Sequence, residues 1–598
     1  MEEYTDRTER ETRERTLRDR RERARARARR RRRNQIIIIA LMALLVCGTI
    51  AAIVLIHKYM PSKERADLSE LYTVEEGKAP LFFENERYEK DCLLVDGVPY
   101  VDYETVREMF NKRFYWDANE NLLIYTTPTD VIKTNVGDAS YTVNKNKETM
   151  PHAIVKTQGS DTFISLEFVQ KYTNFEYAAY TEPDRVLVTN NWGTAYTYAA
   201  VKKATQLRME DSVKSSIIAD LAEGAVVRFF SSEDAKGEEN FVLVMTEDGL
   251  IGYVRRKMLD TAYEDTKTRA FEEPTYTSIT KDYKINLAWH QVTNQTANEN
   301  LLNVLSNTKG LTTISPTWFT VTDNQGNIGS IASQTYVDRA HSQNLEVWAL
   351  IDDFTEDVDM HQVLSRTTTR EQLENELISA AIKYNLDGIN IDFEKISRDT
   401  GVHYVQFLRE LSIKCRNNGV VLSVDNYVPT AYSQYYGYAE QGEVCDYVVI
   451  MAYDEHNRSS ETAGSVSSLP YVQSAVSNTL DLVPAEKIIM GIPFYTRLWI
   501  TSEDDEGNET LSSEVYGMNS AANMLKDNNA TAAWDESTGQ NYAQFENSRG
   551  FCQIWLEDEE SIEAKMKVIY DAKLGGVAEW RLVYERPDVW NVIIKYIN

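Results

Sequence analysis

The chain has 598 residues, which is too long for a single hydrophobic core and enough for three or four domains. Its formal net charge is −28, but residues 1–34 hold 15 Arg against 8 Asp or Glu, so the remainder carries a net charge of −35. An acidic main body of this kind argues against a nucleic-acid partner, because phosphate backbones attract basic surfaces.

The basic tail leads into a long apolar run. Residues 36–56 are 21 residues without a charge, and they follow the cluster Arg29–Arg33. A run of about 20 apolar residues crosses a bilayer as one helix, and basic residues beside it stay cytoplasmic. We therefore predict a single-pass cell-membrane protein, with a cytoplasmic tail at 1–34, a transmembrane signal anchor at 35–57 and extracellular C-terminal domains.

A cleaved signal peptide is the alternative to an anchor. Its apolar region usually has about 7–15 residues and ends at a small-residue cleavage site. This run is longer, and the sequence that follows it, His57–Pro61, offers no such site. The Arg-rich tail could also bind nucleic acid, but its interleaved acidic residues favour anionic lipid or a simple topology signal.

Cysteine and histidine are sparse and scattered. Cys47 lies in the apolar run, and Cys92, Cys415, Cys445 and Cys552 form no C-x-x-C pair. The seven histidines also lack metal-ligand spacing. The sequence therefore predicts no metal site, no cofactor and no disulfide framework.

The segment after the apolar run is expected to form a stalk at 58–91, because it is polar and charged, and then a small module at 92–195. The module contains a weak repeat: Tyr100–Val106 aligns with Phe163–Val169, and Leu122–Tyr125 aligns with Val186–Thr189. Each copy reads as a strand, a short helix and paired strands. The module is similar to the α+β unit named after the N-terminal domain of copper amine oxidases. Its matching residues hold no His cluster, so the resemblance implies a spacer or wall-contact unit without copper chemistry.

Residues 200–262 contain short alternating strands separated by Asp-Gly and Gly, which predicts a small β-barrel. The closing stretch, from Asp248 to Val254, reads D-G-L-I-G-Y-V. It resembles the bacterial Src-homology-3-like domain, which implies peptidoglycan binding. A passive barrel spacer is the alternative.

From residue 280 to 598, short apolar strands alternate with helical patterns. Eight candidate strands have the spacing of a (β/α)₈ TIM barrel, and they are 285–289, 312–315, 347–351, 388–393, 420–424, 447–451, 487–491 and 576–580. Thr368 and Glu371 could form a capping box for the helix before the fourth strand, where Leu373, Leu377 and Ala381 recur. A doubly wound sheet is the alternative, but no Gly-rich phosphate loop follows the first strand.

The fourth strand holds the most informative stretch, Asp387-Gly388-Ile389-Asn390-Ile391-Asp392-Phe393-Glu394. Polar and apolar residues alternate, so Asn390, Asp392 and Glu394 share one strand face. Two carboxylates and an amide on an inward face are costly to bury unless they have partners. The cost is expected in an active site, where like charges raise a carboxyl pKa and create a general acid, and a half-exposed strand with a solvated acidic face is the alternative.

The stretch resembles the signature of glycoside hydrolase family 18, D-G-x-D-x-D-x-E, which includes chitinases and cell-wall or spore-cortex lytic glucosaminidases. Asn390 stands where the commonest pattern has Asp, a departure typical of the cell-wall and spore-type members. Other strand ends match the family in the right order, at Met451-Ala-Tyr453-Asp454, Gly491-Ile-Pro-Phe-Tyr495-Thr-Arg497 and Gly575-Gly-Val-Ala-Glu-Trp580. Trp318 follows the second strand, where the wall-lytic branch often has an aromatic residue.

The resemblance implies a retaining, substrate-assisted glycosidase in which the substrate's 2-acetamido oxygen replaces a second enzymic carboxylate. Glu394 would be the acid and then the base, Asp392 would orient the acetamido group, and Tyr453 would donate to its oxygen. The substrate-binding set would be Asn390, Met451, Asp454, Trp580, Tyr495, Arg497 and Trp318. Asp352 and Asp353 could also face the site, but a solvated turn is the simpler expectation for both.

These patterns predict a membrane-anchored glycosidase that cuts β-linkages next to N-acetylated amino sugars, with peptidoglycan as the expected glycan. A chitinase or an endo-N-acetylglucosaminidase on other glycans is the alternative within the same class. A non-catalytic glycan-binding protein and a structural scaffold of the envelope are the alternatives from other classes.

Overall fold

The structure is a computed structural model that describes residues 2–72, 75–503 and 506–597. The chain divides into two compact units, and each unit is built from two separate stretches of sequence. The first unit comprises residues 1–99 and 174–270, and the second comprises residues 100–173 and 271–598. Each unit has a hydrophobic core of its own.

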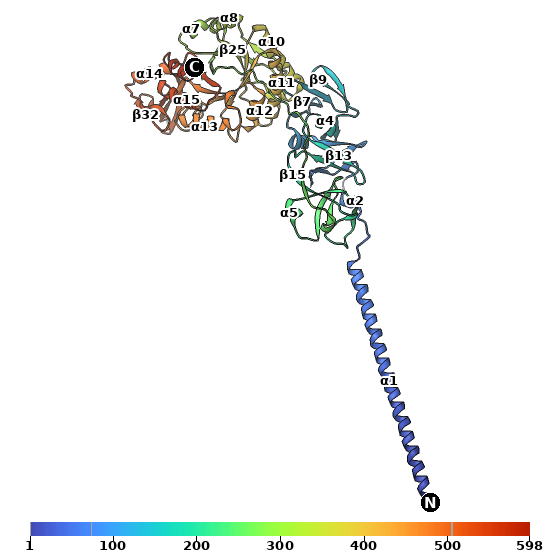
Figure 1. Cartoon of the computed structure of the whole chain (residues 1–598). Helices are drawn as coiled ribbons and strands as arrows, with labels where there is room; N and C mark the ends of the chain where they lie inside the picture. The colour runs from blue at the N-terminus through green and yellow to red at the C-terminus, as the bar shows by residue number, and fades with distance from the viewer. Residues whose placement is uncertain (1, 73–74, 504–505, 598) are drawn as a thin grey trace. The chain divides into compact units, whose positions relative to one another are not determined.

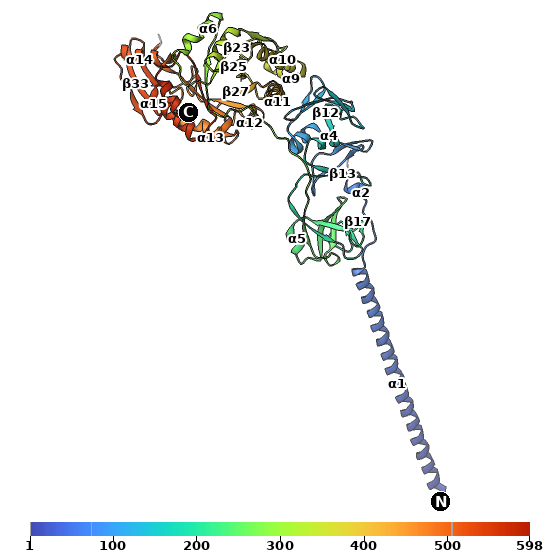
Figure 2. The same ribbon diagram turned by 45° about the horizontal axis from the view of Figure 1, so that its top comes forward.

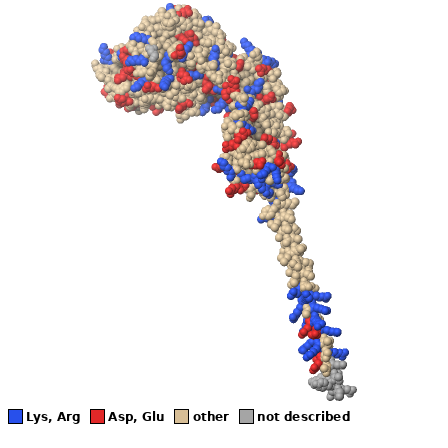
Figure 3. Space-filling view, viewed as in Figure 1, with Lys and Arg blue, Asp and Glu red and all other residues tan. Residues whose placement is uncertain are grey.

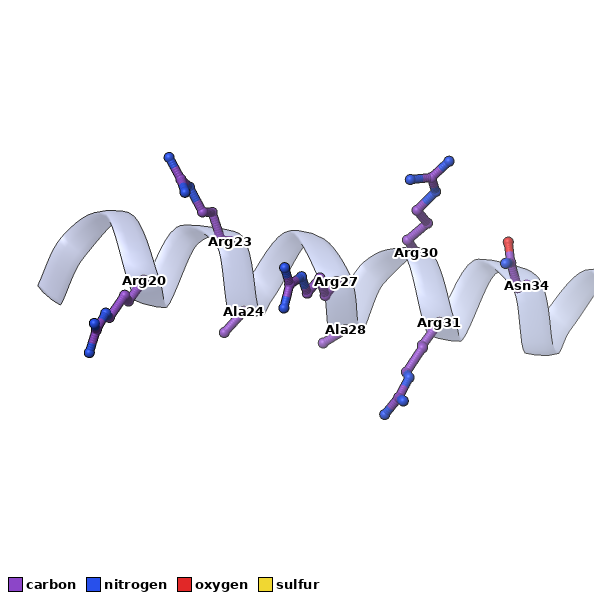
Figure 4. A pocket seen from close by; sticks show the side chains of 8 residues that line it. All are labelled: Arg20, Arg23, Ala24, Arg27, Ala28, Arg30, Arg31 and Asn34. Atoms are coloured by element: carbon purple, nitrogen blue, oxygen red, sulfur yellow. The ribbon is translucent and has the colours of Figure 1, made fainter. Parts of the chain in front are cut away.

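The N-terminus of the first unit is the single helix α1 (Glu2–Tyr59). Among the described residues, α1 is the one helix whose length and composition would permit a membrane crossing, and a signal sequence would pass the same test. Figure 3 shows a band of basic side chains on this helix, followed by an uncharged stretch. The basic charge surrounds the helix rather than forming one face, since Arg23 and Arg30 point away from Arg20 and Arg31 (Figure 4).

The predicted stalk is wrong for part of its length. Strand β2 (Leu81–Phe83) pairs in parallel with β14 (Arg185–Thr189), and Leu81 and Phe82 are buried. An apolar run of this kind gains stability by completing a sheet, so the segment joins the folded unit. Short elements lie near β2 or β14 in the sequence, and they are α2 (Leu68–Leu71), β1 (Lys78–Ala79), β3 (Glu86–Arg87), β4 (Cys92–Val95) and β13 (Glu176–Tyr180).

The region predicted as a small β-barrel is a seven-stranded antiparallel sheet in the order β17-β16-β20-β19-β18-β15-β21. Its strands are β15 (Ala195–Ala200), β16 (Thr205–Arg208), β17 (Ile217–Leu221), β18 (Val226–Phe229), β19 (Phe241–Thr246), β20 (Ile251–Arg255) and β21 (Tyr263–Thr266), with the short helix α5 (Ser232–Lys236). Apolar residues from most of these strands form one core. The turn between β19 and β20 uses Gly249 at a φ of +80°, which favours glycine. The Src-homology-3-like resemblance stays a prediction.

The second unit begins with the stretch 100–173. Strand β5 (Val98–Asp102) pairs antiparallel with β12 (Asp161–Ser165), so the two strands aligned by the predicted repeat are neighbours. Each is followed by a short helix, α3 (Tyr103–Thr105) or α4 (Leu166–Lys171). Strand β11 (Val155–Gln158) extends this sheet. A second antiparallel sheet contains β6 (Phe114–Asp117), β7 (Leu122–Thr126), β8 (Val131–Asn135), β9 (Ser140–Val143) and β10 (Asn146–Thr149).

This stretch is packed against the helical layer of the barrel rather than acting as a spacer. The Oδ2 atom of Asp117 accepts hydrogen bonds from the backbone N–H and the hydroxyl of Thr367, both at 2.6 Å. Glu120 accepts from the backbone N–H of Thr368 at 3.1 Å. Helix α10 (Thr367–Tyr384) is therefore capped from a distant part of the chain, because Arg366 at its N-cap makes no side-chain cap. The predicted Thr368–Glu371 capping box is wrong.

Charged and aromatic contacts extend this interface. Arg113 forms an ion pair with Glu440, between Nε and Oε1 at 2.7 Å, and Tyr115 contacts the Nδ1 atom of His403 at 2.6 Å. Lys133 is paired with Glu371, the residue that the capping box would have used.

The barrel itself agrees with all eight predicted strands. They are β22 (Ile285–His290), β23 (Thr313–Val321), β25 (Glu346–Asp352), β26 (Gly388–Asp392), β27 (Val421–Tyr427), β28 (Tyr447–Met451), β29 (Ile488–Pro493) and β35 (Gly576–Trp580). All pair in parallel, and the pairing of β22 with both β23 and β35 closes the cylinder. The small strand β24 (Ile328–Ser330) pairs antiparallel with the end of β23.

Helices surround the strands, as Figures 1 and 2 show. They are α6 (Gln295–Glu299), α7 (Leu301–Leu305), α8 (Gln334–Ser342), α9 (Met360–Ser365), α10, α11 (Gly401–Asn418), α12 (Tyr438–Val444), α13 (Leu469–Leu480), α15 (Glu559–Asp571) and α16 (Val589–Ile597). The large core lies between strands and helices, and a smaller one that includes Trp289, Trp348 and Tyr447 fills the barrel interior.

Between β29 and β35 the chain inserts an antiparallel sheet that the sequence analysis did not separate from the barrel. It contains β30 (Tyr495–Glu503), β31 (Glu509–Gly517), β32 (Ala533–Asp535), β33 (Gln540–Asn547) and β34 (Gly550–Leu556), with helix α14 (Met518–Asp527).

Candidate active site

The predicted polar row lies on β26 as the alternation required. Asn390 and Asp392 are buried inside the barrel, and Glu394 follows the end of the strand, partly exposed. The alternating residues Ile391 and Phe393 point the other way, into the core beneath the helices. The carboxyl end of the barrel therefore gathers the residues that the signature predicted.

A second polar row, which the sequence analysis missed, lies on the neighbouring strand β27. Ser423 pairs in register with Asn390, and Asp425 and Tyr427 follow at two-residue intervals on the same face. Ser423 and Asp425 are buried. The signal was present in the sequence over a short stretch, because the apolar Leu422 and Val424 alternate with Ser423 and Asp425 in a strand that is flanked on both sides by barrel strands.

The amide of Asn390 makes four hydrogen bonds. Its Oδ1 accepts from the indole N–H of Trp289 at 3.1 Å and from the hydroxyl of Ser315 at 3.2 Å. Its Nδ2 donates to Ser423 at 3.0 Å and to the Oδ1 of Asp425 at 2.7 Å. Asn390 on β26 thus joins residues from three other strands, β22, β23 and β27.

Glu394 is held by two neighbouring side chains. The hydroxyl of Tyr427 donates to its Oε2 at 2.5 Å. The carboxylate of Asp353 accepts from the backbone N–H groups of Glu394 at 3.0 Å and of Lys395 at 2.8 Å. Burial raises the pKa of the Glu394 carboxyl, and the hydrogen bond from Tyr427 partly opposes that rise.

The expectation of a solvated turn is wrong for Asp353, which is fully buried. Burial raises the pKa of its carboxyl to about 6. Its neighbour Asp352 is partly exposed and accepts a hydrogen bond from Thr320 at 2.6 Å. Asp353 therefore fixes the backbone that carries Glu394 rather than facing water.

Asp392 is only 6 % exposed, and its Oδ1 atom has no hydrogen-bond partner within the described part of the chain. Burial is the main reason that its pKa lies well above the ordinary value, and the charges of Asp425 and Glu394 raise it further. A buried carboxyl oxygen without a partner is costly, so it is suited to a donor that arrives with the substrate.

Three aromatic residues meet around this carboxyl end. Trp289 lies 5.8 Å from Trp580 and 6.5 Å from Tyr453 between ring centroids, in edge-to-face arrangements. Trp580 and Tyr453 are half-buried at the ends of β35 and β28, and Met451 is buried. The sequence analysis named Trp580, Tyr453 and Met451 but missed Trp289, which the first strand contributes.

The remaining predicted residues lie farther out. Asp454 is exposed and accepts from the hydroxyl of Tyr495 at 2.6 Å. Arg497, on the inserted sheet, donates to Ser513 at 3.2 Å. Tyr453 and Tyr495 are 6.3 Å apart between ring centroids, which links this outer group to the inner one.

The structure does not bring Trp318 to the site. Its ring is 2 % exposed and lies in the core between strands and helices, where its Nε1 donates to Asn298 at 2.8 Å and its ring meets Tyr336. The prediction that Trp318 contacts the substrate is wrong. Strand β23 continues past residue 315, so Trp318 is a strand residue on the outward face rather than part of an end loop.

Residues 286–585, half of the chain, match the sequence profile of glycosyl hydrolases family 18. The chain belongs to this family. Residues 84–187 match the profile of the copper amine oxidase N-terminal domain, as the repeat predicted. This family 18 member is therefore a glycoside hydrolase with an α+β module before its barrel.

Curated relatives agree with this assignment. The chain is 26 % identical over 269 residues to an uncharacterized glycosylase, YvbX, of Bacillus subtilis, which covers 43 % of this chain and 76 % of that protein. It is 28 % identical over 245 residues to a cortical fragment-lytic enzyme of the same organism, covering 40 % and 56 %. The chain thus spans little more than half the length of that enzyme.

Solved structures similar to this chain include a C-terminal domain of a putative chitinase from Desulfitobacterium hafniense. It has 22 % identity, a TM-score of 0.48, and coverage of 53 % of this chain and 100 % of that one. Another is the spore cortex-lytic enzyme SleL of Bacillus megaterium, with 20 % identity, a TM-score of 0.47, and coverage of 55 % and 79 %.

Proposed function

We propose that this family 18 hydrolase is a membrane-anchored extracellular glycosidase that cuts β-linkages next to N-acetylated amino sugars in peptidoglycan. The reaction we propose is retaining and substrate-assisted. The observation that carries this proposal is the pairing of a hydrogen-bonded acid, Glu394, with a buried carboxyl, Asp392, whose Oδ1 lacks a partner among the described residues.

In the first step, Glu394 donates its proton to the glycosidic oxygen, and the bond from that oxygen to the anomeric carbon breaks. The acetamido oxygen of the substrate attacks the same carbon and forms an oxazolinium ring. Asp392 accepts a hydrogen bond from the acetamido N–H, which orients the oxygen and offsets the developing positive charge. Tyr453 donates to the acetamido oxygen, and Trp580 lies beneath the sugar ring.

In the second step, the Glu394 carboxylate removes a proton from water, and the water oxygen opens the oxazolinium ring at the anomeric carbon. Two displacements at one carbon retain its configuration. The raised pKa of Glu394 suits this exchange, because an acid that is too strong would have lost its proton before the reaction.

Peptidoglycan is favoured by the cortical fragment-lytic enzymes among the relatives, since cortex is a form of that polymer. The membrane anchor rests on the apolar stretch of α1, and the outward orientation rests on the Arg residues before it. Asp454, Tyr495 and Arg497 would bind sugars farther along the glycan.

The test uses the purified full chain in detergent with peptidoglycan and, separately, with chitin oligomers. Mass spectrometry would identify the new reducing ends, and proton NMR would follow the anomer formed first. New N-acetylglucosamine ends from peptidoglycan, in the retained configuration, are the expected result. Chemically de-N-acetylated substrate should resist cleavage, because it lacks the attacking oxygen.

Glu394→Gln is the matched control, since it keeps the size and hydrogen-bonding capacity of the acid but cannot supply its proton. It should abolish turnover and preserve the melting temperature. If only chitin oligomers are cleaved, the substrate is chitin rather than peptidoglycan. If both glycans bind tightly and neither is cleaved, the protein is a glycan-binding protein rather than an enzyme.

A further inference from the structure

Glu394 lies beyond the part of the sheet that holds its strand. The last residue of β26 that pairs with β25 is Asp392, and the last that pairs with β27 is Ile391. Inside a parallel sheet, the backbone of a strand is held by hydrogen bonds to its neighbours. The backbone at Phe393 and Glu394 has left that ladder, so other groups must satisfy it and fix the direction in which the acid points.

Two peptide groups flank the Cα atom of Glu394, and each is hydrogen-bonded at both of its ends. Their N–H groups belong to Glu394 and Lys395 and donate to the carboxylate of Asp353, at 3.0 and 2.8 Å. A third side chain, Tyr436, reaches their C=O groups, because its hydroxyl donates between the carbonyl oxygens of Phe393 and Glu394, 3.3 Å from each. A peptide group is planar, so holding both ends fixes its orientation and with it the Cα–Cβ bond of the acid. We call Asp353 and Tyr436 the Glu394 clamp.

Tyr436 is itself held in place. It is 1 % exposed, and its ring meets that of Tyr404 edge to face, with 5.8 Å between the centroids. Its carbonyl oxygen accepts from the side-chain amide of Gln441 at 2.9 Å. Gln441 exchanges two further hydrogen bonds with Asn426 of β27, at 2.7 and 3.1 Å. The segment that carries Tyr436 is therefore anchored to the strand beside the acid.

The same segment also holds the side-chain partner of the acid. The hydroxyl of Tyr438, the first residue of α12, donates to the backbone carbonyl of Tyr427 at 3.2 Å, and Tyr427 in turn donates to the Glu394 carboxyl. Gly437 separates the two tyrosines at a φ of +72°, and a Cβ atom there would lie 2.5 Å from Cγ2 of Val405. This turn therefore lets one tyrosine hold the backbone of the acid while the next holds its side-chain partner.

We propose that Tyr436 is a positioning residue for the general acid, and that the Glu394 clamp aims the Glu394 carboxyl at the glycosidic oxygen. The inference rests on the proposed function, because it names a residue that supports the same reaction. Tyr436 is buried and acts only through Glu394. An acid displaced by about 1 Å can lose about 100-fold in rate, since proton transfer requires the two oxygens to approach within hydrogen-bond distance.

Tyr436→Phe removes the hydroxyl and keeps the ring with its packing. The carbonyl oxygens of Phe393 and Glu394 lose their donor, and the two peptide groups are then held at one end only. We expect kcat on glycan to fall by about 10–100-fold. KM should stay within about twofold of the wild-type value, because the groups that would bind the sugar are unchanged.

The leaving group distinguishes a misaimed acid from a general loss of structure. A glycosidic oxygen within a glycan needs a proton as its bond breaks, whereas dinitrophenolate leaves as a stable anion without one. On a dinitrophenyl glycoside of an N-acetylglucosamine oligomer, Tyr436→Phe should therefore have a kcat/KM close to that of the wild type. Equal losses on the glycan and on the dinitrophenyl glycoside would overturn the proposal.

Tyr404→Phe is the matched control. Tyr404 is fully buried against the Tyr436 ring, and its hydroxyl has no hydrogen-bond partner within the described part of the chain. The substitution removes the same atom from the same aromatic cluster without releasing a backbone group. It should leave kcat on both substrates unchanged and keep or raise the melting temperature. A loss of kcat as large as that of Tyr436→Phe would assign the effect to packing and overturn the proposal.

Amide hydrogen exchange of the full chain, measured by mass spectrometry, separates this inference from the proposed function. The N–H groups of Glu394 and Lys395 should exchange faster in Tyr436→Phe than in the wild type and in Tyr404→Phe, whether or not any glycan is cleaved. Equal exchange in all three proteins would overturn the Glu394 clamp. Lack of turnover by the wild type would overturn the proposed function and leave the exchange result to decide the clamp.

Discussion

The carboxylate of Asp117 should contribute measurably to the stability of the second unit. Asp117 is fully buried, and its Oδ2 accepts both the first backbone N–H of α10 and the hydroxyl of Thr367. Its Oδ1 accepts from the backbone N–H groups of Asn119 and Glu120, at 2.9 and 3.0 Å. Removing the side chain leaves these four donors without that acceptor.

Loss of a helix N-cap costs about 1 kcal/mol, and a buried donor left unpaired costs about 1–3 kcal/mol, so Asp117→Ala should destabilise the unit by about 2–4 kcal/mol. The unit has about 400 residues. With an unfolding entropy of about 2.1 cal/mol/K per residue, this loss lowers the melting temperature by about 2–5 °C.

Thermal unfolding of the full chain, followed by circular dichroism, would measure the change. Asp161→Ala is the control, since Asp161 is exposed in the same stretch and its side chain accepts a hydrogen bond from the adjacent Ser160. The reasoning is refuted if Asp117→Ala melts within about 1 °C of that control.

Three further outcomes are expected. Tyr427→Phe removes the donor that stabilises ionised Glu394, so the pKa of the acid rises and the alkaline limb of the pH–kcat/KM profile should move to higher pH. Burial raises the pKa of Asp353 from its ordinary value near 3.8 to about 6 in the folded protein, so its contribution to stability is complete below about pH 4 and is lost as the pH rises through 6. Asp353→Asn should flatten this fall in melting temperature across that range. Lys565→Met leaves the buried Glu557 carboxylate unpaired and should cost about 3–5 kcal/mol in denaturant unfolding, and adding Glu557→Gln should restore part of it.

The sequence predicted the barrel because each strand carries its own local signal. Short β-branched runs at regular spacing mark the strands, and the alternation through 389–394 places Asn390 and Asp392 on the inner face. These features depend on neighbours in sequence, so they could be read without coordinates.

Most of the features that the sequence analysis missed or misplaced depend instead on a partner far away in the chain. The cap of α10 comes from Asp117, 250 residues before Thr367. Asp425 becomes meaningful only beside Asn390, and that pairing follows from the register of two strands. Trp318 was misplaced because the length of β23 could not be read from its sequence.

Because the second unit is built from two separate stretches of sequence, its two parts leave the ribosome at different times. Residues 1–99 and 174–270 complete the first unit once residue 270 has left the ribosome, but the stretch 100–173 must then wait for the barrel. At about 5–20 residues per second, Asp117 emerges roughly 12–50 s before Thr367 exists to receive its hydrogen bonds. During that interval the stretch 100–173 lacks the barrel surface that it packs against. The folding of this protein therefore depends on the rate of translation.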